Sequence, residues 1–139
     1  MNKDSADTKY YLHEHLNLVQ QIVTRMGQNS FAIKAGYIAI IAGLLTFETN
    51  YKQNNIIINF IIMVIFVYLD AFYLTREREY RILYELLIKP TKIYNRNPYS
   101  LTVPKKINIF KTIFSSVLLI FYAGIFGILT LFQYFQLTD

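Results

Sequence analysis

The chain has 139 residues, of which 54% are hydrophobic and 17% charged, and its mean hydropathy is +0.29. Soluble domains carry about 25% charged residues, so the composition argues against an ordinary soluble protein and against a mostly disordered one. The absence of cysteine excludes disulfide scaffolds, thiolate metal sites and cysteine nucleophiles, and the net charge of +5 makes the placement of the cations informative.

Residues 1–30 are polar and predict a cytoplasmic amphipathic helix. Its apolar residues recur at alternating spacings of four and three, which is the pattern of a helix that packs along one seam. The seam residues are Leu12, Leu16, Val19, Val23 and Met26. The same register continues through Ser30 and beyond, so we expect one long helix that enters the membrane, with 27–30 as the best candidate for a break or bend. The seam fits two interpretations: packing on the 75–88 helix of the same chain, or contact with other copies.

Three apolar stretches predict transmembrane helices at about 31–48, 55–74 and 112–135. A bilayer core of ~30 Å takes about 20 helical residues, and the second and third stretches are apolar on every face, unlike the helices of a soluble bundle. The predicted fold is therefore an all-α integral membrane protein with three transmembrane helices and cytoplasmic helical extensions. We expect it to be homo-oligomeric.

Basic residues gather before the first stretch and between the second and third. Only Lys52 of the 14 lysines and arginines lies between the first two stretches. The positive-inside rule then places the N-terminus and 75–111 in the cytoplasm. The loop between the first two spans and the tail at 136–139 are expected to be external.

Small residues recur every four positions in the first span, at Ala35, Ala39 and Gly43. In lipid, small residues let helix backbones approach closely. This face predicts helix–helix packing, either within one chain or between chains.

Lys34 and Asp70 are the two charged residues inside the apolar spans. Such residues are costly in a membrane unless they are paired or hydrated. Because the first two spans form an antiparallel hairpin, both charges are expected at the same depth and predict an ion pair. The alternative is that Lys34 extends to the interface while Asp70 bonds local hydroxyls such as Tyr37 or Tyr68.

The segment 75–111 continues the second span as a helix to Lys89, before Pro90, and is followed by a loop. It carries nine basic residues against three acidic ones, a local net charge of +6. Positive charge interleaved with tyrosine is typical of surfaces that bind nucleotides or single-stranded nucleic acid. The alternative is retention on the cytoplasmic side with binding of anionic lipid. The candidate ligand-binding residues are Arg76, Arg78, Arg81, Lys89, Lys92, Arg96, Lys105 and Lys106.

Catalytic motifs are missing from the sequence, which has no GxGxxG, P-loop, HExxH or GxSxG pattern. His13 and His15 form the one metal-like cluster, but their spacing puts the two rings on different sides of a helix, whereas helical zinc sites use positions four apart. We therefore expect no enzyme, no cofactor and no bound metal.

Two segments resemble a family of small bacterial membrane proteins. RMGQNSFAIK runs from Arg25 to Lys34, and DAFYLTREREYRILY runs from Asp70 to Tyr84. Family members carry RM-x-x-NSF-x-x-K before the first span and D-A-x-Y-L-x-x-E-R-x-x-R-x-L-Y at the end of the second. The resemblance covers most of the chain and includes NPYSL before the last span. It departs at 35–37, where members usually have a tryptophan and this chain has none.

Members of that family often lie in defence islands and resemble the membrane effectors of anti-phage systems such as the Hailong type, in which a nucleotidyltransferase makes oligonucleotides that hold a membrane channel closed. The resemblance implies a homo-oligomeric channel in the bacterial inner (cytoplasmic) membrane that depolarises the membrane during infection. The implied partners are copies of the same chain, the lipid bilayer, a nucleotide or oligonucleotide second messenger, and a soluble nucleotidyltransferase encoded nearby.

Three functions fit these features. The first is a ligand-gated oligomeric channel that acts as a toxic effector, because three spans cannot enclose a pore alone. The second is a non-conducting membrane anchor or scaffold that holds a soluble partner through the N-terminal seam or through 75–111. The third is a holin-like or immunity protein. Expression alone separates them: a scaffold is harmless, a holin is always toxic, and a gated effector is toxic only in the absence of its inhibitor or in the presence of its activator.

Overall fold

The computed structural model describes residues 3–47, 55–89 and 100–138. Within these residues every regular element is a helix, which confirms the predicted all-α class. In chain order the helices are α1 (Lys3–Phe47), α2 (Asn55–Ile88), α3 (Ile109–Ile113) and α4 (Ser116–Thr138). Lys92, Arg96 and most of the predicted hairpin between the first two spans lie outside the described residues.

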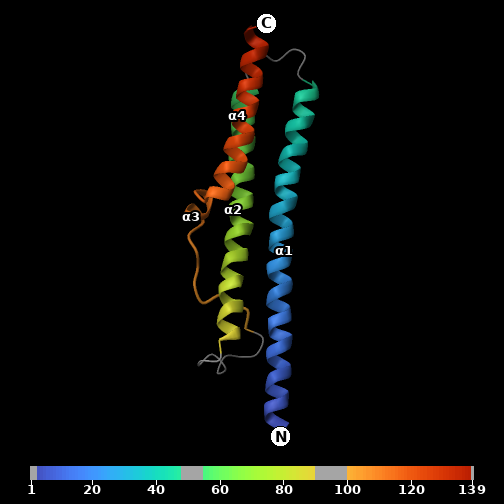
Figure 1. The fold of residues 1–139 in the computed structure, drawn as a ribbon, viewed down its shortest axis with the longest axis vertical. Coiled ribbons are helices and arrows are strands. Elements are labelled where there is room, and N and C mark those ends of the chain that lie inside the picture. Colours follow the sequence, from blue (N-terminus) through green and yellow to red (C-terminus); the bar gives the residue numbers. More distant parts are fainter. Residues whose placement is uncertain (1–2, 48–54, 90–99, 139) are drawn as a thin grey trace.

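Helices α1 and α2 run antiparallel and side by side, as Figure 1 shows. Helix α1 has 45 residues and is about 68 Å long at about 1.5 Å per residue. Since the bilayer core measures ~30 Å, α1 is long enough to cross it and still extend well beyond. This agrees with the prediction that one helix joins the polar N-terminal segment to the first span.

Helix α1 is continuous through residues 27–30, so of the break or bend predicted there the break does not occur. Contacts with α2 explain the difference. A Cβ added at Gly27 would lie 3.6 Å from the Glu77 carboxylate, so α1 and α2 are close there, and the Ser30 hydroxyl donates a hydrogen bond to Asp70. A glycine in a helix costs about 1 kcal/mol, which tertiary contacts of this kind readily exceed.

The seam of α1 packs on α2 of the same chain. Val19 is completely buried, and further along the seam the Tyr37 ring packs on Phe66 with ring centroids 5.6 Å apart. Of the two interpretations of the seam, the structure therefore supports packing within one chain.

Helix α2 is continuous from the apolar residues after Asn55 through the charged residues after Leu74 to Ile88. The predicted helical continuation of the second span beyond residue 74 is thus confirmed. The apolar half and the charged half of α2 form one continuous helix. The position of a residue along α2 therefore tells how far its contacts lie from the apolar half.

The predicted third span, 112–135, begins at the wrong residue. Thr112 belongs to the short helix α3, and α4 begins only at Ser116. The chain turns at Phe114, and Ser115 follows directly, so the break falls at a serine pair, a common site of helix kinks. At the other end α4 continues to Thr138, so most of the predicted tail at 136–139 is helical.

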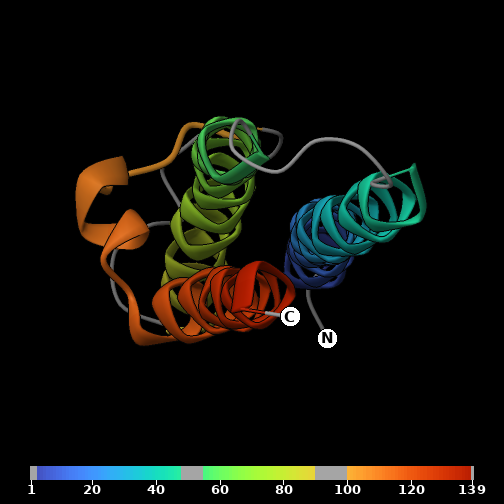
Figure 2. The ribbon, with the colours of Figure 1, turned by 90° about the horizontal axis from the view of Figure 1, so that it is seen from above.

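Seen end on in Figure 2, α1, α2 and α4 surround a common core, and α3 projects to one side. The six buried hydrophobic residues of this core come from all three long helices. They are Tyr37, Ile41, Ala71, Leu118, Tyr122 and Leu129. Side chains fill the space between the helices, so the bundle has a packed interior.

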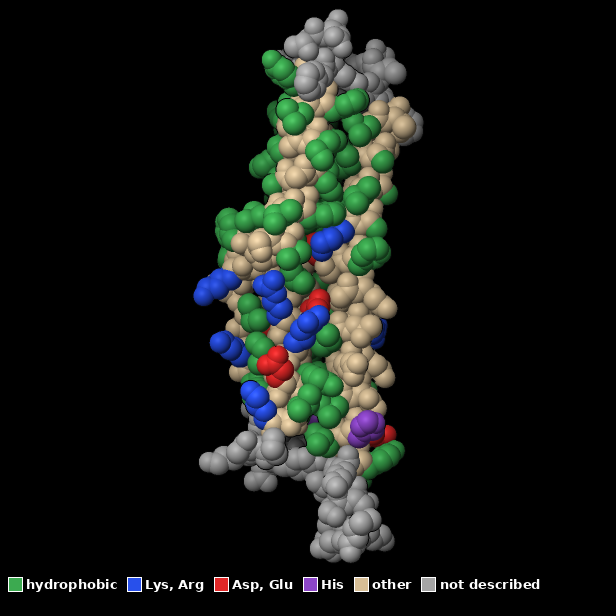
Figure 3. Space-filling view, viewed as in Figure 1, with side chains coloured by type: hydrophobic (Ala, Val, Ile, Leu, Met, Phe, Trp, Pro, Cys, Tyr) green, Lys and Arg blue, Asp and Glu red, His purple; other side chains and the backbone are tan. Residues whose placement is uncertain are grey.

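Large hydrophobic side chains also cover the outside of one half of the molecule (Figure 3). Two helices, Tyr10–Thr46 and Ile56–Ile88, are long and apolar enough to cross a membrane. In α4 the apolar stretch within the described side chains is Ser116–Phe132, which is shorter. An apolar exterior of this kind indicates membrane association.

Candidate functional site

A buried polar cluster joins the three long helices at the end of the apolar half. Lys34 Nζ lies 2.5 Å from Asp70 Oδ2 and donates a hydrogen bond of 2.9 Å to the Ser30 hydroxyl. Ser30 in turn donates to Asp70 Oδ1, and the Tyr122 hydroxyl donates to Asp70 Oδ2 at 3.1 Å. The structure therefore brings Lys34 and Asp70 together within one chain.

The helical repeat explains how α1 supplies two of these groups. Ser30 and Lys34 are four residues apart and lie one above the other on the face turned to α2. Asp70 is completely buried, while 20% of the Lys34 side chain is exposed. A buried carboxylate needs such compensation, because an unpaired charge in an apolar surrounding costs several kcal/mol.

Aromatic rings enclose this polar cluster. The centroids of the Tyr37 and Tyr122 rings are 5.1 Å apart, and Lys34 Nζ lies 6.0 Å from the centroid of the Phe121 ring. Tyr37 is completely buried, and its hydroxyl has no hydrogen-bond partner among the described residues. The rings place apolar surface beside the ion pair, which lowers the local dielectric and so strengthens the pair.

The two hydroxyls that bond Asp70 are not those considered from the sequence. Tyr68 is 56% exposed, and neither it nor Tyr37 contacts Asp70; the donors are Ser30 and Tyr122. Sequence reasoning assigned Ser30 to the seam and did not single out Tyr122. A polar group in an otherwise apolar stretch was the one signal that could have indicated Tyr122.

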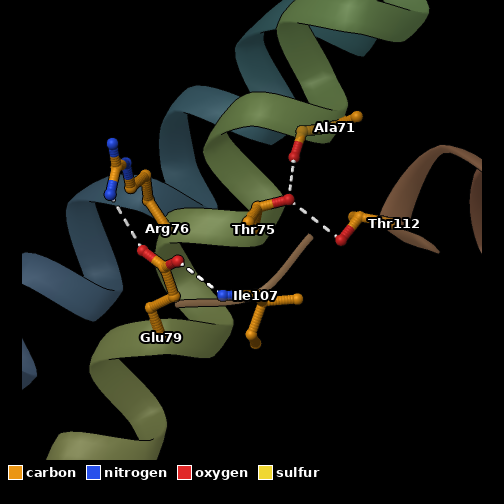
Figure 4. A network of polar contacts seen from close by, with 6 residues as sticks. All are labelled: Ala71, Thr75, Arg76, Glu79, Ile107 and Thr112. Atoms are coloured by element: carbon orange, nitrogen blue, oxygen red, sulfur yellow. Dashed lines mark hydrogen bonds and ion pairs between the residues drawn. The ribbon is translucent and has the colours of Figure 1, made fainter. Parts of the chain in front are cut away.

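A second polar network joins α2 to the segment before α4 (Figure 4). The Thr75 hydroxyl donates to the Ala71 carbonyl at 2.7 Å and lies 2.9 Å from the Thr112 hydroxyl. One turn further along α2, Glu79 accepts a hydrogen bond of 2.8 Å from the Ile107 backbone N–H. Its other oxygen pairs with Arg76 at 2.9 Å. Sequence analysis did not predict this network, which fixes residues 107–112 against α2.

Two of the candidate ligand-binding residues are already engaged in ion pairs. Arg76 pairs with Glu79 and Arg81 pairs with Glu77, both along α2. These pairs reduce the positive charge that Arg76 and Arg81 can offer to a ligand.

The other described candidates for ligand binding have no described carboxylate partner. Four make no ion pair within the part of the chain that the structure describes, and these are Arg78, Lys89, Lys105 and Lys106. All four are at least partly exposed. Figure 3 shows lysine and arginine side chains gathered on the half of the molecule away from the apolar end.

The small-residue face of α1 is turned outward. Ala35 and Ala39 are exposed, and a Cβ added at Gly43 would meet nothing within 4 Å. The small residue that does approach α2 is Gly36, where an added Cβ would lie 3.6 Å from the Phe66 ring. The structure therefore leaves the predicted packing face uncovered within the chain.

The N-terminal half of α1 carries a shallow hollow and the two histidines. A shallow open hollow on it is lined by polar residues, which are Asn17, Gln20, Gln21, Thr24 and Arg25. His15 is buried and its Nε2 has no partner in the described part of the chain, while His13 is exposed. No group of three or more potential metal ligands occurs among the described residues.

Comparison of the chain with protein families, curated proteins and solved structures finds no match. The resemblance to small bacterial membrane proteins of defence islands therefore stays a prediction.

Proposed function

We propose that the protein is a membrane protein with three spans whose copies assemble into an ion channel, and that an anionic nucleotide or oligonucleotide gates it from the cytoplasm. In this proposal the protein is an effector of bacterial anti-phage defence, in the inner membrane, that depolarises the cell when the channel opens. Helix α4 is the third span, and the basic half of α2 lies in the cytoplasm.

The observation that carries this proposal is the uncovered small-residue face of α1. Ala35 and Ala39 are exposed, whereas the seam of the same helix packs on α2. Faces of this kind allow close approach of a second helix in lipid, where packing rather than the hydrophobic effect drives association. A second copy of the chain would cover this face.

The packed interior supports an assembly rather than a pore through one chain. Tyr37 and Tyr122 are buried between the three long helices, together with the Lys34–Asp70 pair. Since side chains fill that space, ions have to pass between copies.

Arg78 on α2 and Lys89, directly after the end of α2, are cations that remain available for a ligand. Arg76 and Arg81 have carboxylate partners, whereas these two make no ion pair with any described residue. In a symmetric assembly each such cation is repeated around one axis. A polyanion that bridges several copies could thus bind one conformation better than another, which is the requirement for gating.

A non-conducting membrane anchor is the second candidate function. It is favoured by the length of α1 and α2, which extend well beyond the ~30 Å of a bilayer core and expose polar side chains there. Packing of the seam on α2 removes one of the two surfaces proposed for a soluble partner. The anchor would therefore hold its partner through the charged half of α2.

Ion flux separates the two functions. The purified protein is reconstituted in liposomes, and flux is measured with and without short oligonucleotides on the side that carries the basic residues. A gated channel gives a flux that the oligonucleotide raises or lowers, and Arg78→Gln with Lys89→Gln should reduce that response. Glu85→Gln, an exposed position on the same half of α2, is the matched control.

Absence of flux from an intact oligomer, under all conditions, would contradict the channel and favour the anchor. Flux that never responds to an oligonucleotide would contradict the gating and favour a holin-like protein. Expression in growing cells adds an independent measurement, since an anchor is harmless when it is produced alone.

A further inference from the structure

Two aromatic rings are exposed at helix α3, one from Phe110 within the helix and one from Phe114 directly after its last residue. Phe110 is 66% exposed and Phe114 is 71% exposed. The opposite side of this short helix faces the protein interior: Thr112 is completely buried, and Ile109 and Ile113 pack against the core. Phenylalanine has no polar group that could bind water. Two exposed rings four residues apart therefore indicate contact with an apolar surrounding.

The contact with α2 fixes the depth at which these rings lie. Thr112 is held by Thr75, which directly follows the apolar residues 56–74 of α2 and directly precedes Arg76. Helix α3 therefore lies at the boundary between the apolar and the charged half of the molecule. In Figure 1 it stands beside α2 on the side away from α1, where no other described element covers it.

Three lysines lie within five residues of Phe110 in the sequence. Lys105, Lys106 and Lys111 are all exposed, and none makes an ion pair with a described residue. The segment 100–115 contains no aspartate or glutamate. The nearest acidic side chain on α2, Glu79, is already occupied by Arg76 and by the Ile107 N–H.

We propose that α3 and the two lysines before it form a binding site for anionic phospholipid at the membrane interface. Phe110 and Phe114 enter the boundary between headgroups and acyl chains, and the ammonium groups of Lys105 and Lys106 bind the phosphate of an anionic headgroup. Apolar side chains next to lysines at this depth fit an interfacial lipid surface. A free polyanion would leave both rings in water.

This site goes beyond the proposed channel and does not depend on it. It requires that the apolar half of α2 lies in a membrane and that residues 107–112 keep their contacts with α2. Figure 4 shows those contacts, with Ile107 and Thr112 bonded to residues one turn apart on α2. The rings are therefore held at a fixed depth by the helix that crosses the apolar phase.

The chain contains no tryptophan, so one introduced indole can serve as the single reporter. We suggest the variant Phe110→Trp, reconstituted in vesicles of phosphatidylcholine with a minority of phosphatidylglycerol. Bromine, which quenches indole fluorescence on contact, is placed on the acyl chains of one lipid or of the other at equal mole fraction. The ratio of the two quenching efficiencies gives the preference of the site for the anionic lipid.

We expect a clear preference of the site for phosphatidylglycerol. Lys105→Gln and Lys106→Gln should each lower this preference by about fivefold. Added salt should also weaken the preference. Arg25→Gln is the matched control, because this exposed cation lies on α1 and outside the segment 100–115. Ile120→Trp, at a position of α4 that is 75% exposed, reports contact with bulk lipid and should show no preference.

Equal quenching of the Phe110→Trp indole by both lipids would overturn the site, and so would a preference that survives the double lysine substitution. Absence of quenching at Phe110→Trp while the Ile120→Trp indole is quenched would show that α3 lies outside the interface. A failure of the channel measurement would leave these results unaffected.

Discussion

Lys34 on α1 and Asp70 on α2 form an ion pair of 2.5 Å next to the apolar half of the molecule, with the Asp70 side chain completely buried. Ser30 and Tyr122 complete the coordination of the carboxylate, so Asp70 contacts both other long helices. The pair thus fixes the register of α1 against α2 and provides the attachment point for α4.

Removing the lysine alone should be much more damaging than removing both charges. We expect Lys34→Met to lower the free energy of unfolding by about 3 kcal/mol or more, because it leaves a buried carboxylate without its cation. The double variant Lys34→Met with Asp70→Asn should recover most of this loss, since the amide oxygen still accepts a hydrogen bond from one hydroxyl and the amide nitrogen can donate to the oxygen of the other. Unfolding in detergent, followed by circular dichroism, measures both.

A double-mutant cycle gives the coupling between the two residues. Additive losses in Lys34→Met and Asp70→Asn would show that the two charges act independently, and would contradict the structural role given to the pair. Lys111→Met serves as a control, because this lysine is exposed and makes no ion pair with a described residue.

The sequence could place Lys34 near Asp70 because two physical constraints act together. Charged groups in apolar helices need a partner, and an antiparallel hairpin brings the ends of neighbouring spans to one depth. The break predicted at Gly27–Ser30 does not occur, because tertiary contacts there act against the local sequence preference. Local helix propensity was poor there, but packing on α2 outweighs it.

The role of Tyr122 was missed because the third apolar stretch is hydrophobic on every face, and the tyrosine hydroxyl alone does not indicate which face meets α2. Helix α3 was missed for a similar reason. Its boundary rests on a long-range contact between Thr112 and Thr75, and the pair Ser115 and Ser116 was the one local signal of a kink.

Tyr122→Phe should loosen α4 without altering the α1–α2 pair. The substitution keeps the ring and removes the hydroxyl that donates to Asp70 at 3.1 Å. Hydrogen bonds to charged groups contribute about 1.5 to 3 kcal/mol, so we expect faster amide hydrogen exchange along α4 and little change in α1. Tyr68→Phe is the control, because Tyr68 is 56% exposed and should have no effect. Unchanged exchange in α4 would show that apolar packing alone holds this helix.

Thr75→Val should destabilise the protein more than the double variant Thr75→Val with Thr112→Val. The single change leaves the completely buried Thr112 hydroxyl without its partner, which costs about 1 to 3 kcal/mol, whereas replacing both hydroxyls by methyl groups of the same shape is close to neutral. Thermal unfolding in detergent measures the difference. A single variant as stable as the wild type would show that α3 is not held by this contact.

Substitutions at neighbouring small residues of α1 should separate packing within the chain from packing between copies. Ala39→Leu enlarges an exposed position, so we expect the monomer fold to survive while crosslinked oligomers in membranes decrease severalfold. Gly36→Leu enlarges a position where an added Cβ would already be in van der Waals contact with the Phe66 ring, at 3.6 Å. The further leucine atoms would have to displace the ring, so we expect the α1–α2 pair itself to be destabilised, since inserting extra side-chain atoms into a packed contact costs about 1 to 3 kcal/mol. Crosslinking and unfolding are measured on both variants.

If Ala39→Leu leaves the oligomers intact, the outward face of α1 is not the contact between copies. The assembly proposed for the channel would then have to use another surface.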